Sequence, residues 1–147
     1  MYKRQEYVGS LTEGCILLAH SQGGLFTLEA ALKNPQNVRG VILVESSSTL
    51  DVDKTDVSAL AGVPFLFVYG DFLGEEYCID GYKWPGAFAW EGSMRKLHEW
   101  VVAHGGDSTW LELPKLGIRG DTHALMMESN SDEIADVVCD WIDEHVR

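Results

Sequence analysis

The chain has 147 residues, of which 46% are hydrophobic and 10% aromatic, a size and composition typical of one globular domain rather than of a disordered chain. Its 23 acidic and 11 basic side chains give a net charge of −12, which argues against nucleic acid and anionic membrane surfaces as partners, because clustered Lys and Arg are needed to bind phosphates. No apolar stretch approaches the roughly 20 residues that cross a bilayer, and the opening MYKRQEYVGSLTEG lacks the apolar core of a secretory signal peptide.

The first predicted elements are a strand and a helix. The run GCILLAH (14–20) is short, apolar and continuous, which is typical of a strand covered on both faces. After Ser21, the segment LFTLEAALKN has its apolar residues at helical spacing and ends at Asn34 and Pro35. These apolar residues are Leu25, Leu28, Ala31 and Leu32.

Two further buried strands are predicted at 40–45 (GVILVE) and 63–70 (VPFLFVYG). The turn residues SSST and a short helical stretch at 56–61 separate them. An aromatic segment follows, which we expect to be irregular. Residues 74–92 are a candidate cap over a substrate pocket, and ordinary packing is the alternative for its aromatic side chains, Tyr77, Tyr82, Trp84, Phe88 and Trp90.

The last predicted elements are a helix at 93–106, a fourth strand at 108–114, a loop at 115–130 and a final helix. The first of these helices has Met94, Leu97, Val101 and Val102 on one side. The final helix has a stripe of five apolar residues, Ile134, Val137, Val138, Trp141 and Ile142.

This alternation predicts a single domain (1–147) of the α/β class, with four parallel strands and helices on both faces of the sheet. In such sheets, functional groups collect at the carboxyl ends of the strands. The polar side chains that follow the four strands are Ser21, Glu45, Asp71 and His123.

Ser21 is a candidate nucleophile because it lies between a strand and a helix, with small residues at Ala19 and Gly23. A nucleophile on a sharp strand-to-helix turn needs small residues two positions away on either side. The backbone N–H of Gln22 would then receive the developing oxyanion. The alternative for Ser21 is a plain helix N-cap.

His123 is the candidate base, since it follows the last strand, as the chain order nucleophile, acid, histidine requires. His20 precedes the serine, and we expect it to point elsewhere. Two carboxylates compete to orient the imidazole: Glu45 after the second strand and Asp71 after the third. The alternatives are a solvated strand end for Glu45 and a turn residue for Asp71.

Three cysteines, Cys15, Cys78 and Cys139, form an odd number without metal-type spacing. We expect Cys15 and Cys139 to be buried thiols, which favours a reducing compartment such as the cytoplasm. The sequence implies no metal or other cofactor. A nucleotide-binding function is disfavoured because no glycine-rich phosphate loop occurs.

From ILLAHSQGG to WIDEHV, the chain resembles the carboxyl-terminal half of the α/β-hydrolases, that is, their last four strands. It is most similar to a bacterial and fungal esterase-like subgroup, in which HSQ precedes small residues, a glutamate closes the next strand (GVILVES) and the histidine loop resembles GIRGDTHALM. The resemblance implies Ser21 as nucleophile, Glu45 as acid and His123 as base, and ranks Glu45 above Asp71, which would set the neighbouring loop.

The function implied is that of a serine hydrolase acting on small carboxylic esters through an acyl-enzyme. Trp84, Trp90, Leu125 and Met126 are candidates for its pocket, with core packing the favoured alternative for Leu125 and Met126. One departure opens an alternative: the earlier strands of the fold, and the loop that donates the second oxyanion N–H, have no counterpart in the residues before 15. A longer protein or a second copy of the chain is therefore expected to cover the first strand. The alternative function is a non-catalytic module that acts through dimerisation or partner binding.

Overall fold

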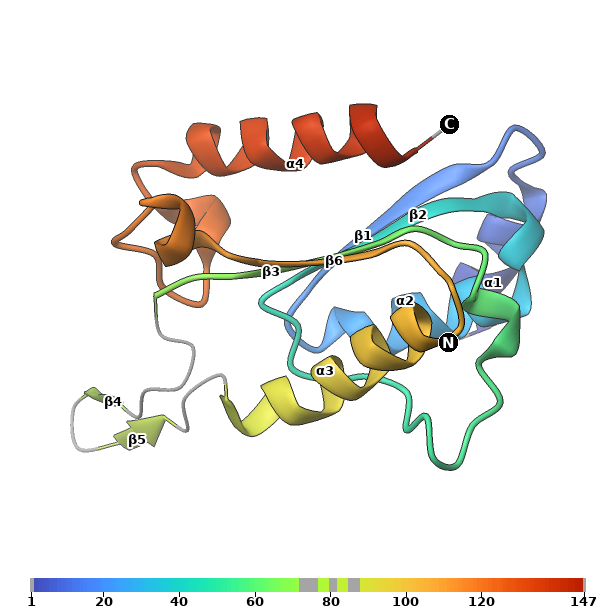
Figure 1. Cartoon of the computed structure of the whole chain (residues 1–147), viewed down its shortest axis with the longest axis horizontal. Coiled ribbons are helices and arrows are strands. Elements are labelled where there is room, and N and C mark those ends of the chain that lie inside the picture. The colour runs from blue at the N-terminus through green and yellow to red at the C-terminus, as the bar shows by residue number, and fades with distance from the viewer. Residues whose placement is uncertain (1, 72–76, 80–81, 85–87, 147) are drawn as a thin grey trace.

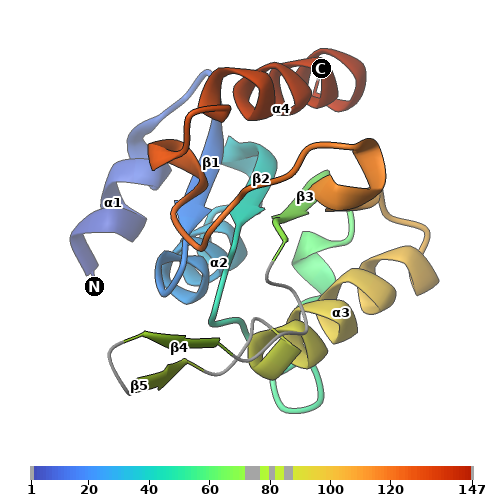
Figure 2. The same cartoon turned by 90° about the vertical axis from the view of Figure 1, so that its left-hand side faces the viewer.

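The computed structural model describes residues 2–71, 77–79, 82–84 and 88–146. Its main sheet has four parallel strands in the order β1-β2-β3-β6. They are β1 (Cys15–His20), β2 (Val38–Val44), β3 (Phe65–Tyr69) and β6 (Ser108–Glu112). A two-stranded antiparallel hairpin, β4 (Tyr77–Ile79) and β5 (Tyr82–Trp84), lies apart from this sheet (Figure 2).

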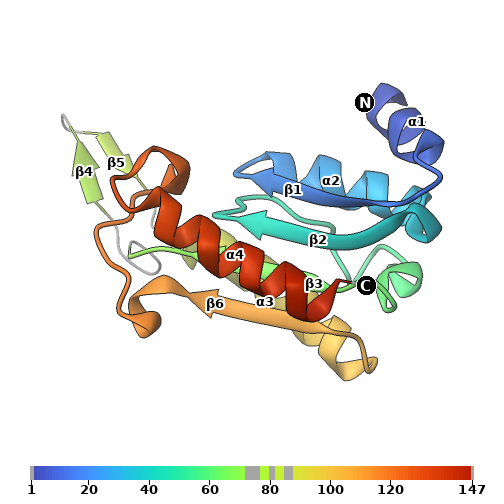
Figure 3. The ribbon, with the colours of Figure 1, turned by 90° about the horizontal axis from the view of Figure 1, so that it is seen from above.

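Helices cover both faces of the main sheet, which confirms the predicted α/β architecture. Helix α4 lies along one face, and α2 and α3 lie along the other (Figure 1). Helix α1 packs beside α2, near the β1 edge of the sheet (Figure 3). The helices are α1 (Tyr2–Ser10), α2 (Gly23–Lys33), α3 (Phe88–Ala103) and α4 (Ser131–His145). Four 3₁₀ turns complete the order: Pro35–Asn37, Ser58–Leu60, Leu113–Leu116 and Leu125–Met127.

Alternation along the strands divides the core into two layers, because successive side chains of a strand point to opposite faces. In β3, Phe65, Phe67 and Tyr69 pack on the α2 and α3 side, and Leu66 and Val68 pack on the α4 side. All five are fully buried. This central strand is therefore apolar throughout, the pattern from which it was predicted.

The strand register brings the carboxyl ends of the sheet together. His20, the last residue of β1, is paired with Val44 of β2, and Val44 is paired with Val68 of β3. The segments that leave these strands therefore start side by side. This edge of the sheet is where the sequence places its candidate catalytic residues.

Strand β1 forms an outer edge of the sheet. Among the described strands it pairs only with β2. Leu18 is 60% exposed, although it lies in the middle of this apolar strand. The described part of the chain thus leaves one edge of an apolar strand without a partner strand.

Several details differ from the sequence-based expectations. Helix α1 was not predicted, and α3 begins at Phe88 rather than at 93. A hairpin occupies part of the segment expected to be irregular. Val102 is 51% exposed rather than packed with its neighbours on α3, and Cys139 is exposed on α4 rather than buried. No helix among the described residues is both long enough and apolar enough to span a bilayer.

Candidate active site

Ser21 occupies the turn between β1 and α2, and its backbone has the left-handed φ of 54°. This conformation is costly for a residue other than glycine, and it is characteristic of the turn that lifts a nucleophile above a sheet. A Cβ built on Gly23 would lie 3.5 Å from the Cβ of Ala19. Small residues at both positions therefore allow the chain to reverse tightly at Ser21.

The serine-rich segment after β2 braces this turn. The carbonyl oxygen of Ser21 accepts hydrogen bonds from the Ser47 N–H (3.1 Å) and the Ser46 hydroxyl (3.2 Å). The Ser48 hydroxyl donates to the carbonyl oxygen of Gln22 at 3.0 Å. A Cβ on Gly24 would lie 1.9 Å from Ser46 Oγ, so only glycine allows this contact. The sequence predicts a turn at the serine-rich segment, but it does not show that this segment supports the turn at Ser21.

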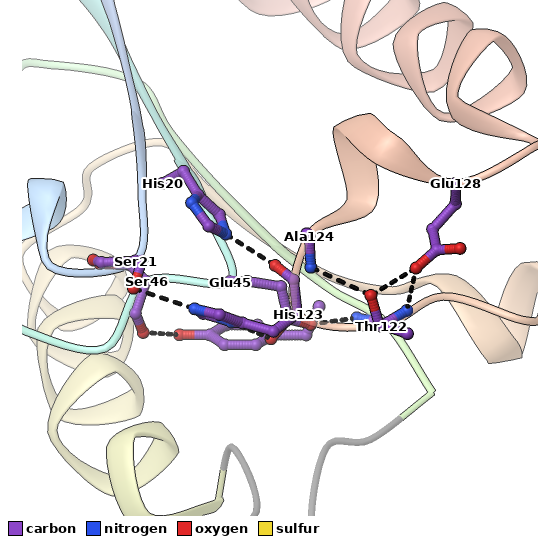
Figure 4. Close-up of polar contacts among 10 residues, drawn as sticks. His20, Ser21, Glu45, Ser46, Thr122, His123, Ala124 and Glu128 are labelled. Carbon is purple, nitrogen blue, oxygen red and sulfur yellow. Dashed lines mark hydrogen bonds and ion pairs between the residues drawn. The ribbon is translucent and has the colours of Figure 1, made fainter. Parts of the chain in front are cut away.

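Three predicted residues meet at the carboxyl edge of the sheet. Ser21 Oγ lies 2.9 Å from His123 Nε2, and His123 Nδ1 lies 3.4 Å from Glu45 Oε2 (Figure 4). The second distance is at the long end for an N–H···O hydrogen bond. Because a carboxylate only accepts, Nδ1 is the nitrogen that donates to Glu45, and Nε2 is left to accept from the serine hydroxyl.

Glu45 is buried, with 3% of its surface exposed, so it is not the solvated strand end that was one alternative. Its Oε1 accepts the backbone N–H of Gly70 at 2.6 Å, and its own backbone has a φ of 45°. Main-chain strain at the ends of both β1 and β2 thus turns a side chain toward His123.

Asp71 holds the histidine loop instead of contacting His123. Its carboxylate accepts the N–H groups of Gly120 (2.7 Å) and Asp121 (3.0 Å) and forms an ion pair with Arg119 (3.4 Å). Farther along the loop, Glu128 accepts hydrogen bonds from the N–H and hydroxyl groups of Thr122. The segment 119–122, directly before His123, is therefore held by two carboxylates.

His20 differs from its expectation, because it points toward the site. Its Nε2 lies 2.6 Å from the carbonyl oxygen of His123, and the two ring centroids are 4.6 Å apart (Figure 4). The sequence offered only one signal for this role, the position of His20 immediately before Ser21.

A cavity of about 710 Å³ opens above Ser21. Its lining is polar near the serine and apolar on one side, where Leu25 and Phe26 of α2 contribute. Among the described residues, the cavity is lined by His20, Ser21, Gln22, Leu25, Phe26, Ser47, Ser48 and His123. The backbone N–H of Gln22 has no hydrogen-bond partner within the described residues, so it is available to a ligand.

Two of the four residues expected to form a pocket, Leu125 and Met126, have described side chains. Leu125 is 1% exposed and packs in the core layer under α4, and Met126 is 53% exposed on the surface; neither lines the cavity. The side chains of Trp84 and Trp90 lie outside the described part of the structure, and so do residues 74–76, 80–81 and 85–87 of the candidate cap at 74–92. Within the described ranges, no group of three His, Cys, Asp or Glu side chains could hold a metal ion.

The chain is similar to proteins with the α/β-hydrolase fold. Residues 13–68, which include Ser21 and Glu45, match the family model described as the alpha/beta hydrolase fold. The structure resembles that of a novel bacterial esterase with a TM-score of 0.83 and 27% sequence identity. The match covers 97% of this chain and 42% of the esterase chain, so this chain spans less than half of the esterase's length. The sequence has no match among curated proteins.

Proposed function

We propose that this chain carries the catalytic residues of a serine hydrolase that cleaves small carboxylic esters through an acyl-enzyme intermediate. Ser21 is the nucleophile, His123 the general base and Glu45 the acid that orients the imidazole. The observation that carries the proposal is the 2.9 Å contact between Ser21 Oγ and His123 Nε2 on a strained strand-to-helix turn. The similarity to an esterase supports the choice of an ester as the substrate.

In the proposed reaction, His123 Nε2 takes the Ser21 hydroxyl proton as Oγ attacks the acyl carbon. Glu45, hydrogen-bonded to Nδ1, stabilises the imidazolium that forms. The imidazolium then donates the proton to the leaving alkoxide. A water molecule, deprotonated by the same nitrogen, releases the carboxylic acid from Ser21 in the second half of the reaction.

The tetrahedral intermediate needs donors for its oxyanion, and the free N–H of Gln22 is the candidate within the described residues. Hydrolases of this fold use a second N–H from another loop. Removing one oxyanion donor from an enzyme costs about 10²- to 10³-fold in rate. We therefore propose low ester turnover for the isolated chain, with the serine still able to react with a strong electrophile.

The test is covalent labelling by a fluorophosphonate, followed by intact-mass spectrometry of the full chain. Wild-type protein is expected to gain one adduct, and Ser21→Ala none. Ser93→Ala, which removes an exposed hydroxyl on α3, is the matched control and should label like wild type. A folded wild-type chain that takes up no adduct would refute the proposal.

A non-catalytic module remains the second candidate, favoured by the short coverage of the esterase, 42% of its length, and by the unpaired edge of β1. In that case, a second copy of this chain or the remainder of a longer protein would cover β1. A chain that associates through this edge but is not labelled at Ser21 would support the second candidate over the first.

A further inference from the structure

His20 is a second histidine beside the candidate nucleophile. It ends β1, lines the cavity above Ser21 and is half-buried. Its ring lies beside that of His123, with an angle of 40° between the two planes. The proposed reaction gives it no role in proton transfer, because its hydrogen-bonded nitrogen contacts a backbone carbonyl rather than the serine.

The chemistry of this contact defines the direction of the hydrogen bond. The carbonyl oxygen of His123 can only accept, so His20 Nε2 must carry a proton and donate it across 2.6 Å. This hydrogen bond ties the end of β1 to the main chain of the residue that supplies the base. It joins two segments that are 103 positions apart in the sequence.

Two carboxylates, those of Asp71 and Glu128, support the loop at residues that precede His123. Asp71 binds the backbone N–H groups of Gly120 and Asp121, and Glu128 binds Thr122. The main-chain carbonyl of His123 itself is held by His20. Loss of this hydrogen bond would remove a support of the main chain at the residue whose ring lies 2.9 Å from Ser21 Oγ.

We infer that His20 is a positioning residue: its Nε2–H fixes the backbone of His123 and thereby keeps the imidazole in line with the Ser21 hydroxyl. This inference rests on the proposed function. A displacement of about 1 Å at a reacting group can cost about 100-fold in rate. Loss of the His20 donor is therefore expected to slow the reaction of Ser21 while the nucleophile, base and acid all remain present.

The experiment compares second-order rates of fluorophosphonate labelling among variants of the full chain. His20→Phe keeps a ring of similar size but removes the donor, and it should label about 10- to 100-fold more slowly than wild type. His20→Gln restores an N–H donor near the position of Nε2, and it should recover most of the lost rate. His104→Phe is the matched control, because it removes an imidazole whose Nδ1 donates to a backbone carbonyl on the surface of α3, 2.7 Å from Trp100 O.

A ¹⁵N NMR spectrum of the histidine rings reports which ring nitrogen of His20 carries the proton. A role in packing alone would not require either tautomer. In Ser21→Ala protein, neutral His20 should be the Nε2–H tautomer. Equal labelling of His20→Phe and wild type, failure of His20→Gln to recover, or an Nδ1–H tautomer for His20 would each overturn the inference while leaving the proposed function intact. Absence of labelling in the wild type would overturn both.

Discussion

At the scale of single residues, hydrogen bonding shows which of two carboxylates contacts the imidazole of His123. Position in the sequence alone did not decide between Glu45 and Asp71. Glu45 is buried and reaches His123 Nδ1, whereas Asp71 binds three consecutive residues at the start of the histidine loop. We therefore predict that Glu45→Gln lowers the labelling rate of Ser21 by about 10³- to 10⁴-fold, the scale seen when a triad acid loses its charge and the histidine its tautomer.

The paired variant is Asp71→Asn, which removes the same charge one strand away. It loosens the loop but leaves the Ser21, His123 and Glu45 contacts possible, so the expected loss is about 10-fold. Labelling rates and circular dichroism spectra are measured for both proteins. A larger loss in Asp71→Asn than in Glu45→Gln, with both folded, would exchange the roles of the two carboxylates.

The glycine pair at the start of α2 provides a second residue-level prediction. A Cβ on Gly24 would lie 1.9 Å from Ser46 Oγ and 2.6 Å from Ser48 O, whereas a Cβ on Gly23 would meet only Ala19, at 3.5 Å. Gly24→Ala is therefore expected to lower the free energy of unfolding by about 1–3 kcal/mol, because the serine-rich segment must move. It should also slow labelling, since that segment braces the turn at Ser21.

Gly23→Ala is the matched control, and it should change the free energy of unfolding by less than about 1 kcal/mol. Urea denaturation followed by tryptophan fluorescence measures both values. Equal stability of the two variants would mean that the contact between Gly24 and Ser46 does not constrain the turn.

At the scale of elements, His98 couples α3 to β6 in a pH-dependent way. Its Nδ1 lies 2.8 Å from Ser108 Oγ, and its ring packs against Phe67 and Trp110. Burial, and secondarily the charge of Arg95, lowers the pKa of His98 below its ordinary value of 6.5. The unfolded chain therefore binds the proton more readily than the folded chain, and stability falls as the pH drops below about 6.5.

We predict that His98→Gln flattens this part of the stability profile. The free energy of unfolding is measured by urea denaturation in steps from pH 7.5 to pH 5, in both proteins, at constant ionic strength. The wild type should lose more stability over this interval than the variant. Parallel profiles would show that His98 makes no contribution to the acid sensitivity of the fold.

The sequence predicted well those helices and strands whose apolar residues are spaced so that one or both faces are buried. Strand β3 is apolar on both faces and fully buried, and α4 buries Ile134 and Trp141 from its predicted stripe. Helix α1 was missed because its sequence has no strong apolar stripe. Among its described side chains, Val8 is the one buried apolar residue. Cys139 was expected inside because cysteine usually is, and Val102 because it was grouped on one side of its helix with Leu97 and Val101.

The candidate site was predictable in part, because three of its residues follow predicted strands. Chain order and strand ends brought Ser21, Glu45 and His123 into one hypothesis, because parallel strands end at a common edge. The contact of His20 with a main-chain carbonyl and the bracing of Ser21 by Ser46 depend on how distant segments pack, and no local spacing encodes such contacts.

At the scale of the whole molecule, the edge of β1 and the net charge have opposite effects on self-association. Strand β1 pairs only with β2 among the strands that the structure describes, and its exposed edge, with Leu18, can pair with another chain. The charge of −12 keeps copies apart, but its effect is screened at high salt. We therefore predict that the chain forms dimers that increase with protein concentration and with added NaCl, measured by sedimentation velocity.

Leu18→Lys places a charge on this edge without disturbing the core, because the Leu18 side chain is 60% exposed. The variant should stay monomeric in 0.5 M NaCl, where the Debye length is only about 4 Å. Val102→Lys, at a side chain 51% exposed on α3, makes the same change of charge away from the sheet edge and should dimerise like wild type. Equal dissociation of both variants would point to an interface other than β1. A wild type that stays monomeric at every salt concentration would mean that the edge of β1 does not join two copies.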